Sequence, residues 1–72
     1  MLDKITIIIR EYMDDNSIEV NENTILIADL GLTSFDLVQL ASIVEDELDV
    51  EIPDRIIKNF KSVGDVISFL EK

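Results

Sequence analysis

The chain lacks the two residue types that most often do chemistry in proteins, because its 72 residues include neither histidine nor cysteine. This removes the commonest general base and metal ligand, and it excludes thiolate chemistry and disulfides. Paired carboxylates at Asp14–Asp15 and at Glu45–Asp46–Glu47 could in principle do acid–base work. Exposed acidic runs are far more often a solvated helix face, so we expect no catalytic residue.

Oxygen-rich side chains gather between Asp14 and Asn23, where calcium could bind. Their spacing does not follow the D-x-[DN]-x-[DN]-G-x5-E order of a calcium-binding loop. We therefore expect weak, diffuse cation binding at most, and no metal site. The two glycines, Gly31 and Gly64, do not form a phosphate-cradling loop either.

Ser34 is the side chain best placed to carry a modification. Thr33 and Asp36 fit the [ST]-x-x-[DE] pattern of a capping box, with Thr33 as the N-cap of a helix. The Ser34 hydroxyl would then be exposed at the helix start, where a phosphate ester meets unpaired N–H groups and the positive end of the helix dipole. Alternatively, Ser34 is itself the N-cap, and the local sequence alone favours that simpler reading.

The helix that begins at this cap has two clear faces and should end near Asp49, because Pro53 disfavours helix at Ile52. One face is apolar at helical spacing, formed by Leu37, Leu40, Ala41, Val44 and Leu48. The opposite face carries Phe35, Gln39, Ser42 and Asp46, with Asp36, Glu45 and Glu47 on its flanks.

A first helix is predicted from about Asp3 to Met13, with an apolar stripe at Ile5, Ile8, Ile9 and Tyr12. The β-branched residues also allow a strand, but the stripe and the flanking charges fit a helix better. A long connection follows, polar from Asp14 to Asn23 and then apolar from Thr24 to Leu32. Ile18 and Val20 should attach it to the core.

Two further helices are predicted after Pro53. A short one spans Asp54 to Phe60, and Ser62 can cap a last one with Asp65 three residues on. We therefore expect one all-α domain over residues 1–72. It is a small four-helix bundle with three longer helices, one short helix and a long loop between the first and second.

Negative charge is concentrated in the middle of the chain. The formal net charge is -10, and 13 of the 16 acidic residues lie between Glu11 and Asp54, where there is no Lys or Arg. Such a field excludes nucleic acid as a partner and favours basic protein surfaces, although a solubilising shell would look the same. Nothing resembles a signal peptide, and the apolar stretches are too short to span a bilayer. We expect a cytoplasmic monomer without membrane insertion.

Three blocks of sequence resemble the acyl carrier protein family. Residues 29–40 read DLGLTSFDLVQL, which is similar to the family's D-L-G-x-D-S-L-D-x-V-E-L segment. Residues 45–54 read EDELDVEIPD, which is similar to its acidic helix end and I-P-D turn. Residues 62–66 read SVGDV, which is similar to the start of its last helix. The blocks keep the family's spacing and cover essentially the whole chain.

The resemblance implies a non-catalytic carrier with 4′-phosphopantetheine attached to Ser34 by a phosphopantetheinyl transferase. Acyl-transferring or acyl-modifying enzymes with basic patches would dock on the second helix, and the pathway would be fatty acid biosynthesis or a related one. The partner-binding positions implied are Phe35, Asp36, Val38, Gln39, Glu45, Asp46 and Glu47.

The chain also departs from the family pattern. Thr33 replaces the Asp before the modified serine, and Phe35 replaces the usual Leu; Gln39 and Ser42 also differ. These changes leave open a D-alanyl carrier or another pathway-dedicated carrier. An acidic interaction module without a prosthetic group is the alternative from a different class.

Overall fold

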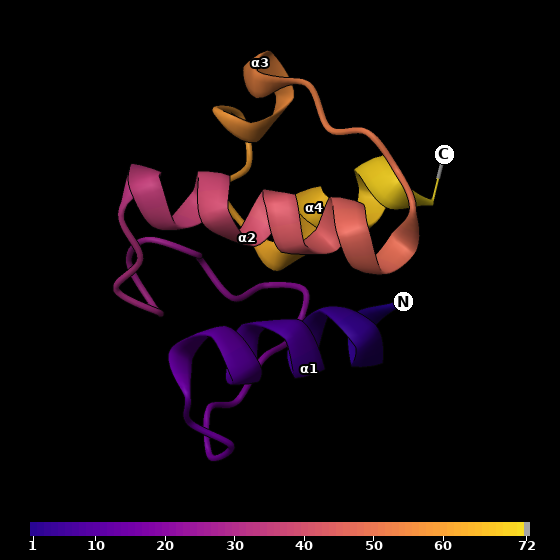
Figure 1. Ribbon diagram of the computed structural model, residues 1–72. Coiled ribbons are helices and arrows are strands. Elements are labelled where there is room, and N and C mark those ends of the chain that lie inside the picture. Colours follow the sequence, from indigo (N-terminus) through magenta and orange to yellow (C-terminus); the bar gives the residue numbers. More distant parts are fainter. Residues whose placement is uncertain (72) are drawn as a thin grey trace.

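The computed structural model describes residues 1–71 and contains four α-helices (Figure 1). They are α1 (Leu2–Met13), α2 (Ser34–Leu48), α3 (Asp54–Ile57) and α4 (Val63–Leu70). Residues 1–71 contain no β-strand, only one isolated bridge. The prediction of an all-α fold with three longer helices and one short one is confirmed. The last residue of the expected domain, Lys72, lies outside the described residues.

α1 is a helix despite its β-branched residues, because its apolar stripe falls on one buried face. Ile5, Ile8 and Ile9 are buried, whereas Ile7, which lies off the stripe, is 54% exposed. Asp14 adopts the left-handed conformation with φ 53°, and the Asp15 N–H donates to the Arg10 carbonyl at 3.0 Å. Together these two features end the helix.

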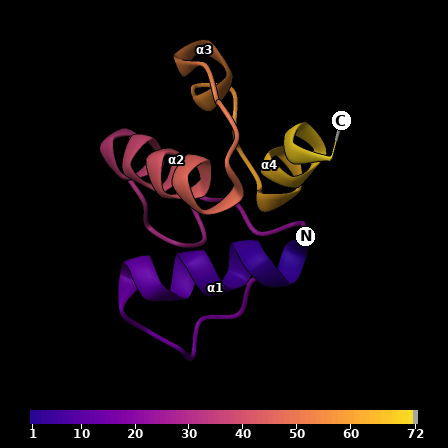
Figure 2. The ribbon, with the colours of Figure 1, turned by 45° about the vertical axis from the view of Figure 1, so that its right-hand side comes forward.

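α2 is the central element of the molecule. It contacts both α1 and α3, while α4 packs against α1, and Figure 2 shows α2 between α1 and α3. Its predicted apolar face is buried at Leu37, Leu40, Ala41 and Val44. The core is completed by buried residues of the other helices and of both long connections: Ile5, Ile8, Ile9, Leu26, Leu32, Ile52, Ile57, Phe60, Val63, Val66 and Ile67. Within residues 1–71, no helix combines the length and the apolar character needed to cross a bilayer.

The long loop between α1 and α2 is held by backbone hydrogen bonds to the start of α4. The Leu26 N–H donates to the Lys61 carbonyl, and the Val63 N–H to the Thr24 carbonyl, both at 2.9 Å. Val20 packs against the core as expected. Ile18 is only half-buried, and its carbonyl accepts a hydrogen bond from Arg10 Nε at 2.8 Å.

The short helix α3 is shorter than predicted, because it ends at Ile57 and not at Phe60. Beyond Lys58 the hydrogen bonds reach back only three residues, from the Asn59 N–H to the Ile56 carbonyl and from the Phe60 N–H to the Ile57 carbonyl. This tighter turn buries the Phe60 ring, which packs edge-on against Phe69 with the centroids 6.0 Å apart.

Candidate functional site

The first turn of α2 is organised by a complete capping box. Thr33 has the extended conformation of an N-cap, and its Oγ1 accepts a hydrogen bond from the Asp36 N–H at 3.2 Å. Asp36 Oδ2 accepts one in return from the Thr33 N–H at 2.8 Å. The cap is therefore Thr33 and not Ser34. Ser34 is the first helical residue, is exposed, and keeps its hydroxyl free of the capping role.

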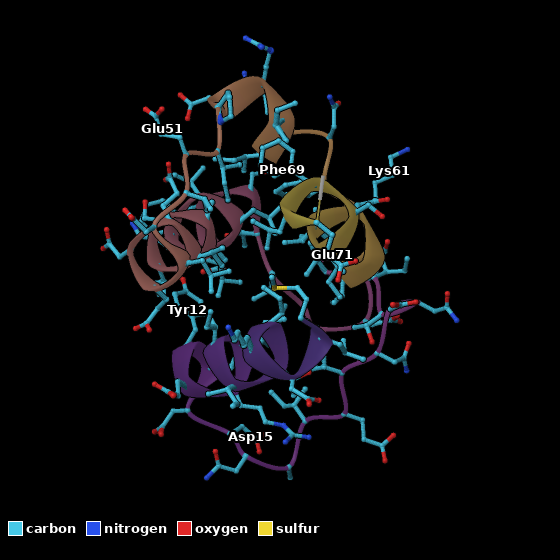
Figure 3. All side chains as sticks on the ribbon, turned by 90° about the vertical axis from the view of Figure 1, so that its right-hand side faces the viewer. Tyr12, Asp15, Glu51, Lys61, Phe69 and Glu71 are labelled. Carbon is cyan, nitrogen blue, oxygen red and sulfur yellow. The ribbon has the colours of Figure 1, made fainter. Side chains whose placement is uncertain are left out.

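A phenol from α1 reaches the same capping box. Tyr12 Oη donates to Asp36 Oδ1 at 2.7 Å, and Figure 3 shows Tyr12 lying between α1 and α2. The Thr33 N–H and then the Tyr12 hydroxyl hold the pKa of Asp36 below its usual value, and donation to Asp36 raises the pKa of Tyr12. Sequence reasoning placed Tyr12 only in the buried stripe. No short sequence pattern predicts a contact between two residues that are 24 positions apart.

The outer face of α2 is exposed as its sequence pattern predicted. Phe35 is 69% exposed and Val38 48% exposed, and both lie on the first two turns beside Ser34. Gln39 is also exposed, and Asp46 and Glu47 lie exposed near the other end of the helix.

Two of the expected docking carboxylates also have bonds inside the domain. Asp36 accepts the bonds from Thr33 and Tyr12. Glu45 is half-buried, and its Oε2 accepts a hydrogen bond from the Ile52 N–H at 2.9 Å. Glu45 therefore ties the end of α2 to the segment that precedes α3. Asp46 and Glu47 are the fully exposed acids of the set.

An apolar groove of about 610 Å³ lies between α2, α3 and the loop before α2, and Ser34 is among its lining residues. It is lined by Ser34 together with Ile25, Ile27, Leu37, Val38, Asp54, Ile57, Lys58, Phe60 and Lys61. Its cations, Lys58 and Lys61, are exposed. The groove thus combines an apolar surface, a free hydroxyl and two positive charges, from segments that are far apart in the sequence.

A second, smaller pocket of about 40 Å³ is lined by core residues. Its lining is entirely apolar and includes Ile5, Leu40, Ala41 and Val44. Leu37 and Phe60 line both the groove and the smaller pocket, so the two adjoin at these side chains.

The remaining acidic residues do not form a metal centre in the described part of the chain. Among residues 1–71, no group of three or more His, Cys, Asp or Glu side chains is placed to hold a metal ion. In the acidic loop, Asp15 Oδ1 accepts hydrogen bonds from the Ser17 hydroxyl at 2.6 Å and the Ser17 N–H at 2.9 Å. These bonds lower the pKa of Asp15. Its carboxylate serves a local turn.

The fold places an exposed serine hydroxyl beside the groove. Ser34 stands at the start of a capped helix in a four-helix domain and is one of the residues that line the groove. An anion bonded to this hydroxyl would meet the N–H groups and the positive end of the α2 dipole.

Comparison with known proteins identifies the family. Residues 3–70 match the protein family described as "Phosphopantetheine attachment site". An acyl carrier protein of Clostridium perfringens is 40% identical over 70 residues, covering 97% of this chain and 92% of the relative. An acyl carrier protein of Caulobacter vibrioides is 36% identical, with 97% and 90% covered. A solved structure of a candidate acyl carrier protein from Mycobacterium tuberculosis superposes with a TM-score of 0.89 at 33% identity, covering 96% of this chain and 92% of the other.

The chain therefore belongs to the acyl carrier protein family, as its sequence resemblance indicated. Members of this family carry phosphopantetheine as a covalent prosthetic group, and so does this chain.

Proposed function

We propose that Ser34 is the attachment residue and that the protein carries acyl groups as thioesters in the cytoplasm, in fatty acid biosynthesis or a related acyl pathway. The observation that carries this proposal is the division of roles at the start of α2. Thr33 makes the capping bonds, and Ser34 is exposed and lines an apolar groove.

The residues around Ser34 fit a phosphopantetheine group. A phosphodiester on Ser34 would lie at the first turn of α2, where helix N–H groups and the helix dipole favour an anion. The exposed Lys58 and Lys61 would add positive charge along the groove. The apolar side chains that line the groove, such as Val38 and Ile57, would contact the hydrocarbon part of the arm. When attached, the arm supplies a terminal thiol that bonds the cargo.

The chain itself supplies a nucleophile for loading but no base. Ser34 Oγ would bond to the phosphorus that bears pantetheine, the bond from that phosphorus to the rest of coenzyme A would break, and the nucleotide would leave. The serine proton needs an acceptor. Asp36 is a poor one, because both of its oxygens accept hydrogen bonds and its pKa is lowered. The base, and the catalysis, would therefore come from the phosphopantetheinyl transferase.

The apolar groove and the smaller pocket favour a hydrocarbon cargo over a D-alanyl group. An ammonium group placed in the apolar pocket that Leu37 and Phe60 help to line would lose its hydration without a partner. A hydrocarbon chain entering the same space would instead remove apolar surface from water. Partner enzymes would dock on α2, with Phe35, Val38 and Gln39 near the arm and the acids Asp36, Glu45, Asp46 and Glu47 facing basic patches. The carrier would act as a monomer.

Loading in solution tests the proposal. The apo-protein is incubated with coenzyme A and a phosphopantetheinyl transferase of broad specificity, and its intact mass is followed. We expect a gain of one phosphopantetheine on the wild type and none on Ser34→Ala, which should stay folded because Thr33 keeps the cap. Loading of Ser34→Ala, or modification mapped to Ser42 or Ser62, would contradict the assignment. A wild type that gains no mass would contradict the proposal that Ser34 is the attachment residue.

A further inference from the structure

Asp36 is the acidic residue closest to Ser34 along the chain, and its carboxylate is held from two sides. The nearest others are Asp29 before it and Glu45 after it, and Thr33 occupies the position directly before the serine. On one side, the N–H and the Oγ1 of Thr33 both lie within hydrogen-bonding distance of Asp36 Oδ2, at 2.8 and 3.1 Å. On the other, the Tyr12 hydroxyl donates to Oδ1 at 2.7 Å.

We propose that Tyr12 is a positioning residue for the loading of Ser34, acting through Asp36 to present one fixed carboxylate oxygen to the transferase. This inference rests on the proposed function of Ser34 and goes beyond it, because it assigns a role in that reaction to a residue of α1.

The hydrogen bond leaves Asp36 able to bind a partner. A carboxylate has about four acceptor positions, and Tyr12 occupies only one of the two on Oδ1. The remaining position on Oδ1 is open to a cationic group or metal ion of the transferase. Because the side chain is already fixed, docking does not have to order it first. Without the phenol, Oδ2 would still be held by Thr33, but Oδ1 would have no partner from the domain.

The hydroxyl contributes little else to the fold. Tyr12 is half-buried, and α1 and α2 are already joined by the buried residues Ile5, Ile8 and Ile9 against Leu37 and Leu40. Tyr12→Phe keeps the ring and removes only the oxygen. Losing one hydrogen bond should lower the melting temperature by several degrees and leave the protein folded at the assay temperature. A control variant with a similar loss of stability then separates an effect on loading from an effect on folding.

The bond itself can be checked in solution without any enzyme. Tyr12 is the only tyrosine and the chain has no tryptophan, so the phenol can be titrated by its ultraviolet absorbance. Asp36 raises the pKa of Tyr12 in the structure. We expect the phenol to ionise at a lower pH in Asp36→Ala than in the wild type, and an unchanged titration would contradict the contact.

The decisive experiment measures kcat and KM for transfer of phosphopantetheine from coenzyme A to wild type, Tyr12→Phe, Asp36→Ala and the double variant. We expect Tyr12→Phe to raise KM for the carrier about two- to ten-fold, the size of one net hydrogen bond. Because Ser34 Oγ is untouched, kcat should change little. In the Asp36→Ala background, Tyr12→Phe should have no further effect, since its partner is gone.

Ile9→Val is the matched control. It removes one buried methyl group from the same helix without touching Asp36, so it should lower stability and leave KM unchanged. Three outcomes would each overturn the role of Tyr12. Tyr12→Phe could have the same KM as the wild type, or Ile9→Val could raise KM as much as Tyr12→Phe does. The third is that Tyr12→Phe raises KM as much in the Asp36→Ala background as it does alone. A wild type that is not loaded at Ser34 would instead overturn the proposed function.

Discussion

At the scale of single residues, neighbouring hydroxyls at the start of α2 have separate roles. Thr33 lies outside the helix with extended backbone angles, so its side chain can turn back to the Asp36 N–H. Ser34 is the first residue of the helix and takes no part in the capping box. The sequence suggested this division through the spacing of Thr33 and Asp36, but it also allowed Ser34 as the cap. Only the backbone geometry decides between the two.

The capping carboxylates predict how stability depends on pH. The pKa of Asp36 is lowered first by the Thr33 N–H, and that of Asp65 first by the Ser62 N–H and then by the Lys61 N–H. A carboxyl with a lower pKa in the folded state contributes stability above its unfolded pKa, and this contribution is lost as the pH falls through the folded value. Stability should therefore drop below about pH 4.

Asp65→Asn should show a shallower drop in urea unfolding measured between pH 5 and pH 2. Asp46→Asn removes the same charge from an exposed position and should keep the slope of the wild type. Identical slopes for the two variants would mean that the capping box of α4 does not contribute to the acid sensitivity.

At the scale of elements, the sequence predicted the long helices well because each carries its own signals. The stripes and capping residues placed the starts of α2 and α4 correctly. The end of α3 and the contact between Tyr12 and Asp36 were missed. Both depend on neighbours that are distant in the sequence, as does the attachment of the long loop to α4 through the backbone atoms of Leu26 and Lys61. Hydrogen bonds between backbone atoms do not depend on residue type, so the sequence pattern does not predict them.

The junction between the long loop and α4 predicts a costly substitution. The Gly64 N–H donates to the Glu22 carbonyl at 2.9 Å, and a Cβ on Gly64 would lie 2.9 Å from the same oxygen. Gly64→Ala must push the loop away, at a cost of about 1–3 kcal/mol in the free energy of unfolding. Ser68→Ala, at an exposed position of the same helix, should be nearly neutral. Urea unfolding of both variants checks this; equal stability would show that the loop yields freely.

The groove beside Ser34 predicts a charge effect of the attached arm. If Lys58 and Lys61 face the phosphodiester, the Lys58→Gln/Lys61→Gln double variant should gain less in melting temperature on loading than the wild type does. The expected difference is a few degrees, because exposed ion pairs contribute about 1 kcal/mol or less. Arg55→Gln, on α3 and exposed but outside the groove, should behave like the wild type. An equal gain in melting temperature on loading in all three proteins would show that the two lysines do not interact with the phosphodiester.

At the scale of the whole molecule, the charge is large for so compact a domain. Thirteen acidic residues between Glu11 and Asp54 meet no Lys or Arg in that stretch, and the longest dimension is 29 Å. Like charges at such spacing repel one another and oppose the compact state. Because salt limits the reach of this repulsion to roughly 8 Å at physiological ionic strength, added NaCl should raise the melting temperature.

Millimolar Mg²⁺ or Ca²⁺ should raise it at lower concentration, since any ion held better by the folded chain adds stability by mass action. This effect needs no ordered metal site. Thermal melts at neutral pH in low salt, in high salt and with divalent cations test it. A melting temperature that is the same in all three would show that repulsion does not limit the stability of the fold.

The central claim is that phosphopantetheine is attached to Ser34 and that its terminal thiol carries an acyl group as a thioester. The most direct measurement loads the apo-protein from octanoyl-coenzyme A with a phosphopantetheinyl transferase and records intact mass before and after neutral hydroxylamine, which cleaves thioesters. The account predicts one octanoyl-phosphopantetheine on the wild type, loss of the octanoyl group alone with hydroxylamine, and no change of mass in Ser34→Ala. An acyl group that resists hydroxylamine, or one that appears on Ser34→Ala, would contradict it.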